Sequence, residues 1–292
     1  MKYILILSLG FLSLLASSSG FISPSQLKNY LTDNKTVIID VANYKIYKSA
    51  HIKGAINANI TDFIKKDSLY SQLNTNTILQ NEINSLGINS DSKVIIYAHN
   101  TKEGILNSSF LALVLIYAGF ENVSILDGGY LSWVFENELL VSSLKEQSKE
   151  DGNFILNINK NLFLDAKELK INLHSSTVLD ARPPELYYGI SRSKKTKRVG
   201  HITYAKSSYY MHKFLTDTTL RKKEELNEIY INGYEIKKNK EIIVYGDDIF
   251  SASMEWFILY KEMGFKNTKI YYKSLKEWAN DSALPMTRFK WE

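Results

Sequence analysis

An internal repeat is the feature of this 292-residue chain that most restricts its fold. Five landmarks occur twice in the same order, and each second copy follows its first after 140 to 150 residues. The pairs are Asp40 and Asp180, His51 and His201, Ala98 and Gly246, Gly119 and Gly264, and Trp133 and Trp278. A near-constant spacing over five landmarks indicates a duplicated unit. The chain is therefore expected to fold as two similar domains.

Each unit alternates short apolar runs with helical patterns. Residues 36–40, 93–97 and 123–126 are expected as strands in the first unit, and residues 178–180 and 242–245 in the second. Helices are expected over residues 106–117 and from Ser253 onward. This alternation predicts an α/β fold class, with two tandem domains that each hold a mostly parallel sheet flanked by helices.

The polar stretch 142–152 lacks apolar periodicity and marks the joint between the units. We expect a first domain over residues 21–145, a linker over 146–165 and a second domain over 166–292. The second unit has ten extra residues between Asp180 and His201, and they contain the basic run 192–198. A charge run of this kind is typical of a solvent-exposed surface loop.

The first 20 residues have the pattern of a secretory signal peptide. Lys2 is followed by an apolar stretch from Tyr3 to Leu15, interrupted by two serines, and then by the small residues 16–20. The apolar part is too short to span a bilayer comfortably, which favours a cleaved signal over a membrane anchor. We expect an exported protein, periplasmic in a Gram-negative source, with no stable membrane insertion after cleavage.

The composition excludes several kinds of site. The chain has no cysteine, which excludes disulfides, thiolate metal sites and a thiol nucleophile. Its five histidines are scattered without ligand spacing, so we expect no metal site and no cofactor. The net charge is +5, with lysines and acids interspersed, which does not resemble a nucleic-acid footprint. The partner stays open: an unknown protein, to which the 19 tyrosines could offer a surface, or a small anion.

The stretch 241–252 reads as a buried strand, a tight loop and the start of a helix. A loop in this position points its backbone N–H groups at one small volume, where many α/β enzymes hold an anion or a nucleophile. Here the loop consists of Gly246, Asp247, Asp248, Ile249, Phe250 and Ser251. This strand–loop–helix arrangement could hold a catalytic group, but Gly246 stands where a nucleophile would be expected.

Several short motifs resemble a rhodanese homology domain. In the first unit they are Ile39-Asp40, His51-Ile52-Lys53-Gly54-Ala55, Ile96-Tyr97 and Leu126-Asp127-Gly128-Gly129, followed by Trp133. In the second unit they are Leu179-Asp180-Ala181-Arg182, Gly200-His201-Ile202, Val244-Tyr245 and Trp278. Two such domains in tandem resemble the thiosulfate and 3-mercaptopyruvate sulfurtransferases over nearly the whole mature chain.

That resemblance implies a cysteine at the first position of the second-domain loop, which takes sulfur from a donor as a persulfide and passes it to a thiophilic acceptor. Gly246 occupies that position, and its first-domain counterpart is Ala98. The resemblance makes Arg182 the substrate-site arginine. It also implies a glycine pair after the last strand, which is kept as Gly128-Gly129 but becomes Lys273-Ser274 in the second unit.

Two functions remain open from the sequence. The first is a rhodanese-family protein of the cell envelope that is catalytically inactive, a pseudoenzyme acting as a binding or scaffold module. The alternative is a sulfurtransferase that keeps residual activity by a route without cysteine, for example through Ser251 or Ser253 with His201 as base, or through Asp247 or Asp248 as nucleophile.

The simpler expectation for Asp247 and Asp248 is that they cap the helix and disfavour binding of thiosulfate. The first-domain loop His99–Gly104 is expected to be a solvated loop.

Overall fold

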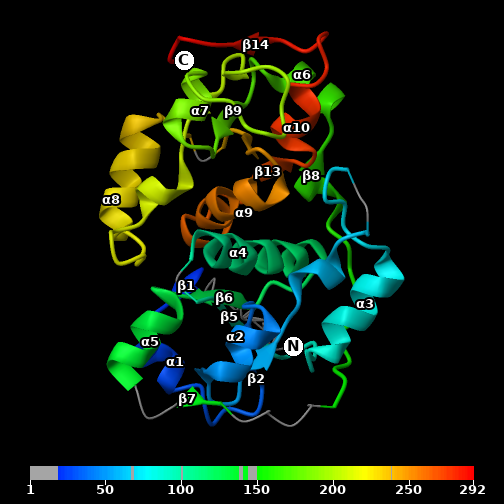
Figure 1. Cartoon of the computed structure of the whole chain (residues 1–292), viewed down its shortest axis with the longest axis vertical. Coiled ribbons are helices and arrows are strands. Elements are labelled where there is room, and N and C mark those ends of the chain that lie inside the picture. The colour runs from blue at the N-terminus through cyan, green and yellow to red at the C-terminus, as the bar shows by residue number, and fades with distance from the viewer. Residues whose placement is uncertain (1–18, 67–68, 100, 138–140, 144–149, 238) are drawn as a thin grey trace, which may run out of the picture.

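The computed structural model describes residues 19–66, 69–99, 101–137, 141–143, 150–237 and 239–292. Two domains are stacked along the long axis of the molecule, the first in blue to green and the second in yellow-green to red (Figure 1). The expected signal peptide lies outside the described residues except for Ser19 and Gly20, as do residues 146–149 of the expected linker.

The first domain is built on a parallel sheet of five strands in the order β1-β6-β5-β2-β4. A separate antiparallel pair joins β3 to β7. The elements are β1 (Phe21–Ile22), α1 (Pro24–Lys28), β2 (Thr36–Asp40), α2 (Tyr44–Ser49), β3 (His51–Ile52), β4 (Ile56–Asn57), η1 (Ile60–Phe63), α3 (Asn76–Ser85), β5 (Lys93–Tyr97), α4 (Lys102–Tyr117), β6 (Val123–Leu126), α5 (Gly129–Asn137) and β7 (Val141–Ser142).

The second domain repeats this plan, with a parallel five-stranded sheet in the order β8-β13-β12-β9-β11 and an antiparallel pair of β10 and β14. The elements are η3 (Lys160–Leu162), β8 (Phe163–Leu164), α6 (Ala166–Asn172), β9 (Thr177–Asp180), α7 (Pro184–Tyr188), β10 (His201–Ile202), β11 (Lys206–Ser207), η4 (Tyr210–Lys213), α8 (Lys223–Asn227), η5 (Glu228–Gly233), β12 (Ile242–Tyr245), α9 (Ile249–Phe257), η6 (Ile258–Glu262), β13 (Thr268–Tyr271), α10 (Ser274–Trp278) and β14 (Met286–Thr287). The matching strand orders confirm the predicted duplication and the α/β fold.

Equivalent side chains make the same internal contacts in each of the two domains. The Tyr97 hydroxyl accepts a hydrogen bond from the Ile52 amide at 3.0 Å, and the Tyr245 hydroxyl accepts one from the Ile202 amide at 3.1 Å. In each copy a buried histidine donates from Nδ1 to the carbonyl of a tyrosine on which its ring also stacks: His51 on Tyr47, and His201 on Tyr187. The histidine–isoleucine landmarks of both units are thus parts of the core.

The two domains meet along α4 and α9, which lie against each other at the centre of the molecule (Figure 1). The Phe110 and Phe250 rings stack with centroids 4.3 Å apart, and the hydroxyls of Ser109 and Ser253 are hydrogen-bonded at 2.7 Å. One cluster of buried apolar side chains contains members from both domains. The interface is therefore continuous with the core of the first domain and with one face of the second.

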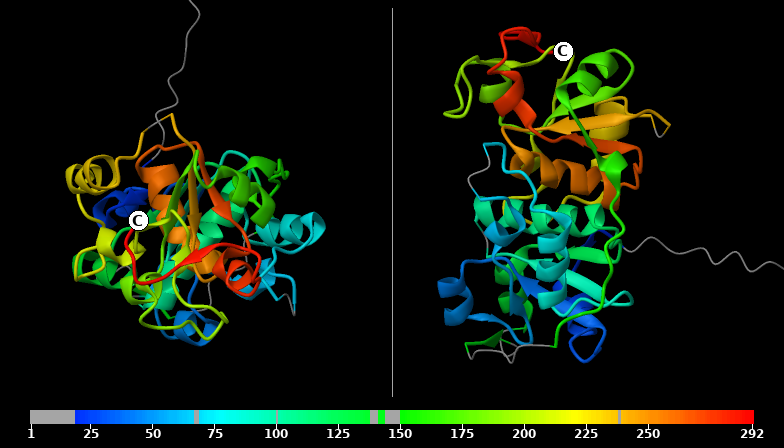
Figure 2. Two further views of the ribbon diagram at one scale, coloured as in Figure 1. Left: turned by 90° about the horizontal axis from the view of Figure 1, so that it is seen from above. Right: turned by 90° about the vertical axis from the view of Figure 1, so that its right-hand side faces the viewer.

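The segment after residue 150 runs along the side of the first domain toward the second (Figure 2). Backbone hydrogen bonds tie it down: the Gly152 amide donates to the Asn84 carbonyl at 2.7 Å, and the Asn157 amide to the Ala118 carbonyl at 2.8 Å. This connection is docked on the first domain, so it adds to the contacts between the two halves.

Both central helices begin earlier than their apolar periodicity predicts. α4 begins at Lys102 instead of Leu106, and α9 begins at Ile249 instead of Ser253. The cause is side-chain capping: Thr101 accepts from the Gly104 amide at 2.9 Å, and Asp248 accepts from the Ser251 amide at 3.1 Å. Each helix therefore starts directly after the loop that follows its strand.

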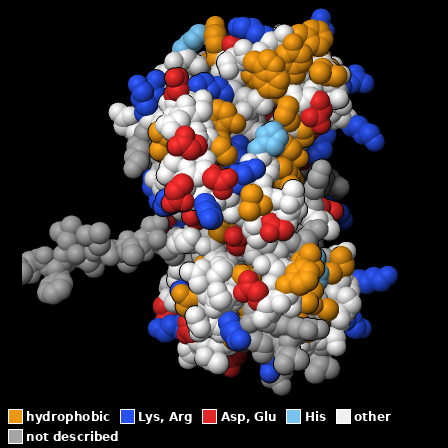
Figure 3. Space-filling model, turned by 90° about the vertical axis from the view of Figure 1, so that its left-hand side faces the viewer, with side chains coloured by type: hydrophobic (Ala, Val, Ile, Leu, Met, Phe, Trp, Pro, Cys, Tyr) orange, Lys and Arg blue, Asp and Glu red, His pale blue; other side chains and the backbone are white. Residues whose placement is uncertain are grey.

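Acidic and basic side chains are interspersed on the face of the molecule drawn in Figure 3. Among the described residues, no helix is long and apolar enough to cross a membrane.

Candidate active-site loop and interdomain cleft

In the loop between β12 and α9, several backbone amides are hydrogen-bonded to side chains of the same chain. Asp248 is the N-cap of α9, and its carboxylate accepts from the Ser251 amide at 3.1 Å. Ser251 Oγ in turn accepts from the Asp248 amide at 3.1 Å, which completes a capping box. The Gly246 amide donates to Ser274 Oγ at 3.3 Å. Three loop amides that would point at a bound anion therefore already have partners within the chain.

Gly246 is closed to any side chain. A Cβ atom placed there would lie 2.2 Å from Ser251 Oγ and 2.9 Å from both the Ala252 nitrogen and the Ser251 carbonyl carbon. All three distances are below the closest approach of real Cβ atoms, and two of these neighbours are backbone. The loop is packed around the missing side chain, whereas Ala98 accommodates a Cβ at the equivalent position of the first domain.

Ser274 is a site residue that sequence reasoning missed. It has φ +53°, close to the φ +60° of its counterpart Gly129, so the second domain keeps the left-handed turn without the glycine. Its hydroxyl donates to the Tyr271 carbonyl at 3.0 Å and accepts from Gly246. The sequence shows that Lys273-Ser274 replaces the glycine pair of the first unit. That replacement does not by itself predict the hydrogen bond between the Gly246 amide and Ser274 Oγ.

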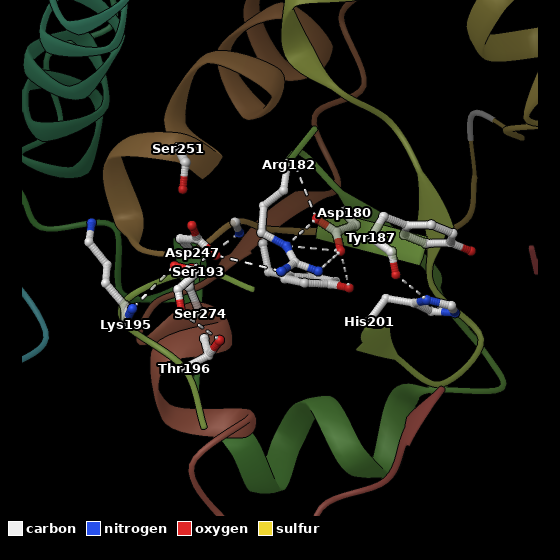
Figure 4. A network of polar contacts seen from close by, with 12 residues as sticks. Asp180, Arg182, Tyr187, Ser193, Lys195, Thr196, His201, Asp247, Ser251 and Ser274 are labelled. Carbon is white, nitrogen blue, oxygen red and sulfur yellow. Dashed lines mark hydrogen bonds and ion pairs between the residues drawn. The ribbon is translucent and has the colours of Figure 1, made fainter. Parts of the chain in front are cut away.

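The Arg182 side chain is bonded to groups of its own domain (Figure 4). The side chain is buried, with Nε donating to Asp180 Oδ1 at 2.9 Å and Nη2 donating to Asp180 Oδ2 at 2.6 Å and to the Gly200 carbonyl at 2.8 Å. Burial opposes the charge, but Asp180 outweighs it and raises the pKa of Arg182 above its ordinary value. Nη1 lies 3.6 Å from Asp247 Oδ1. The predicted substrate-site arginine therefore faces two carboxylates of its own chain.

The loop with the basic run is largely exposed, as predicted for Arg192, Lys194, Lys195 and Lys197, but it also reaches the site. Lys195 Nζ forms an ion pair with Asp248 Oδ2, and Ser193 lies close enough to Asp247 to lower the pKa of that carboxyl. The Arg198 guanidinium donates to the carbonyl of Trp278, the last residue of α10, at 2.7 Å and to that of Leu284 in the segment after it at 2.8 Å. The carboxylates that bind this run lie more than 50 residues away in sequence, so its charge pattern alone could not reveal them.

Asp247 is the least well satisfied group of the loop. Its Oδ1 is buried and has no hydrogen-bond partner among the described residues, although Arg182 lies nearby. Burial raises the pKa of Asp247, and the neighbouring Arg182 and Ser193 oppose that rise. Asp247 points to Arg182, so only Asp248 fulfils the predicted capping role.

The structure does not bring together a serine–histidine pair. His201 is fully buried against Tyr187, and burial lowers its pKa. Ser251 Oγ contacts Asp248, while Ser253 Oγ bonds to the Phe250 carbonyl at 2.8 Å and to the Ser109 hydroxyl. Neither serine has a histidine partner among the described residues, and the Asp248 carboxylate beside Ser251 Oγ is already engaged as the helix cap and in the ion pair with Lys195.

In the first-domain loop, Thr101 and Glu103 are exposed as the sequence predicts, but His99 is packed against its domain. His99 stacks on Tyr130 with centroids 4.2 Å apart, and its Nε2 lies 3.3 Å from Asp40 Oδ2. Asp40 is fully buried, and His99 is only 19% exposed. Asn100 of this loop lies outside the described residues. His99 and Asp247 occupy equivalent positions in the two copies, each beside the strand-ending aspartate of its domain.

A cleft of about 820 Å³ lies between the two loops. Its first-domain wall carries amide and hydroxyl side chains, namely Asn43, Asn57, Asn59, Thr61 and Asn107, together with His99 and Tyr44. Its second-domain wall is formed by Lys195, Asp247, Asp248, Phe250 and Ser251. Among the described residues, no group of three histidine or acidic side chains could hold a metal ion.

Comparison with known proteins identifies the repeated unit. The family profile of the rhodanese-like domain matches residues 23–136 and 165–281. The sulfur carrier protein TtuD of Thermus thermophilus is 23% identical to this chain, over 91% of this chain and 96% of that protein. The thiosulfate sulfurtransferase YnjE of Escherichia coli is 25% identical over 83% of this chain, which corresponds to 57% of that protein.

Among solved structures, an EanB variant in complex with ergothioneine superposes with a TM-score of 0.82 at 20% identity, covering 94% of this chain and 71% of that one. At this identity the likeness shows the fold alone.

Proposed function

Because this chain belongs to the rhodanese-like domain family, we propose that it has lost sulfur transfer and works as a binding or scaffold module. One observation carries the proposal. The position that would hold the persulfide-forming cysteine is Gly246, and the surrounding loop has no room for a side chain there.

The chemistry of a persulfide supports this proposal. A sulfur-transfer cysteine needs a thiolate, and the loop amides and the positive end of the following helix stabilise that charge. Here the Asp248 amide bonds to Ser251 Oγ, the Ser251 amide bonds to Asp248, and the Gly246 amide bonds to Ser274. The loop thus lacks the thiolate, and three of the amides that could receive it or an oxyanion such as thiosulfate are bonded within the chain.

The charges of the loop are also balanced inside the chain. Arg182 pairs with Asp180 and faces Asp247, and Lys195 pairs with Asp248. The first-domain wall of the cleft sets amides and hydroxyls, such as those of Asn57 and Asn107, among apolar side chains such as Ile46, Ile60 and Leu106. These groups suit a polar ligand or a peptide segment that forms hydrogen bonds, and they offer no unpaired cation to a sulfur oxyanion.

We place this function in the cell envelope. The support is the amino-terminal pattern, in which Lys2, the apolar stretch 3–15 and the small residues 16–20 follow one another as in a secretory signal. Fractionation of cells that make the full chain tests this placement. The protein is expected in the periplasmic fraction in a smaller, processed form, and recovery of the uncut chain in the cytoplasm would refute it.

The decisive test of the proposed function is an assay of thiocyanate formation from thiosulfate and cyanide with the purified mature chain. We expect no turnover above the uncatalysed rate, because there is no thiol to carry the sulfur. A cysteine-bearing relative under identical conditions is the positive control. Sustained turnover by a preparation free of contaminating enzymes would establish the alternative, a sulfurtransferase that works without cysteine.

A further inference from the structure

Glu262, at the end of η6 in the second domain, holds the residues with which the described chain begins. Its Oε2 accepts hydrogen bonds from the Ser19 hydroxyl at 2.9 Å, from the Gly20 amide at 2.9 Å and from the Phe21 amide at 3.3 Å. One carboxylate oxygen from the second domain thus binds three successive residues at the start of the first.

The same short segment is built into the first-domain sheet. The Ser19 carbonyl accepts from Ser124 Oγ at 2.7 Å, and the Gly20 carbonyl accepts from the Ile125 amide at 2.8 Å. A Cβ at Gly20 would lie only 3.1 Å from the Glu262 nitrogen, so the chain passes close against η6. Ser19 and Gly20 are therefore part of the folded molecule.

β1 then enters the domain interface. The Phe21 ring lies edge-on to Phe257 at 5.6 Å and to Phe214 at 6.1 Å, both of which belong to the second domain. A chain that began at Phe21 or later would lose the Ser19 and Gly20 contacts to Glu262 and Ser124. Removal of a leader has to spare Ser19 if these contacts are to survive.

The small residues 16–20 offer several bonds to a signal peptidase, and the fold distinguishes between them. A cut before Ser19 places Ala16 and Ser18 at the two positions where such enzymes require small residues. We propose that the leader is hydrolysed between Ser18 and Ser19, and that the new α-ammonium group of Ser19 pairs with the Glu262 carboxylate. Water supplies the hydroxyl to the Ser18 carboxylate and the proton to the Ser19 amine.

This cut adds a charge where the structure already has its counterpart. An α-amino group is largely protonated at neutral pH, and it would lie within one residue of an oxygen that already accepts two backbone amides. Hydrogen bonds between charged partners are stronger than those between neutral ones. Processing thus strengthens a contact that joins the start of the first domain to the second domain.

The inference rests on the proposed export, and its first test separates the two. The full chain with its own leader is produced in a Gram-negative host, and the exported protein is analysed by amino-terminal sequencing and intact mass. We expect a chain that begins at Ser19. An exported chain that begins at any other residue overturns the cleavage assignment and leaves export standing, whereas an uncut chain in the cytoplasm overturns both.

A second test measures the Glu262 contact directly in the purified protein. A chain that begins at Ser19 is compared with one that carries two additional residues before it, each with and without Glu262→Gln. The free Ser19 amine is expected to raise the melting temperature by roughly 2 °C, the size typical of one ion pair near the surface of a protein this large.

That advantage is expected to vanish in Glu262→Gln and to persist in Glu224→Gln, which changes an exposed glutamate of α8. Equal melting temperatures for the two amino-terminal forms, or an advantage that survives Glu262→Gln, would overturn the pairing.

Discussion

At the scale of single residues, substituting Gly246 by cysteine is expected to destabilise the fold without restoring sulfur transfer. The new Cβ meets Ser251 Oγ at 2.2 Å and two backbone atoms at 2.9 Å, and overpacking of this kind costs about 1–3 kcal/mol. The free energy of unfolding is measured in urea, and the mass of the protein is measured after incubation with thiosulfate. We expect lower stability and no added sulfur.

Two further variants sharpen this comparison. Gly246→Cys with Ser251→Ala removes the closest atom but leaves the backbone contacts, so it should recover only part of the lost stability. Ala98→Cys is the matched control, because position 98 already holds a Cβ in the equivalent loop. A Gly246→Cys protein as stable as the native chain, and able to acquire sulfur, would show that only the nucleophile had been lost.

The same residues mark how far sequence can predict the site. Gly246 and Ala98 were found because a repeat places them at equivalent positions, and this argument needs no contacts. Ser274 and Lys195 were missed because each acts through a partner more than 25 residues away, Gly246 for one and Asp248 for the other. A short local pattern carries no record of such pairs.

At the scale of elements, the helix α9 buries an ion pair that amphipathic patterning does not predict. Glu255 of α9 and Lys213 of η4 are both fully buried, with Nζ and Oε2 3.2 Å apart. Ser208 joins them, donating to Glu255 at 2.6 Å and accepting from Lys213 at 2.8 Å. The helical spacing of the apolar residues predicts the helix, but it does not predict that Glu255 is buried or that Lys213 is its partner.

Removing one member of this pair should be far more costly than removing both. Lys213→Met leaves an uncompensated buried carboxylate, and the expected loss is about 3–5 kcal/mol of unfolding free energy. Lys213→Met with Glu255→Leu replaces both charges by apolar groups and should recover most of that loss. Urea titrations of the single and double variants measure the difference. A double variant no more stable than the single one would contradict the pairing as the cause.

At the scale of the whole molecule, the two domains are expected to unfold as one unit, although the sequence presents them as separate repeats. The repeat predicts how many domains exist, but it says nothing about how they meet, because the α4–α9 contact joins residues about 140 positions apart. The shared apolar cluster and the docked segment after residue 150 make the halves energetically dependent on each other.

Phe250→Ala tests this dependence. Phe250 lies in the second domain and stacks on Phe110 of the first, so its truncation should remove about 2 kcal/mol of interface packing. Hydrogen exchange of the amides in β5 and β12 reports the two domains separately. If they unfold together, protection falls by the same free energy in both strands, and calorimetry gives one transition at a lower temperature.

Phe135→Ala, on α5, is the control, because that ring is 82% exposed and its loss should leave both strands unchanged. A loss of protection confined to β12 would show instead that the domains unfold independently.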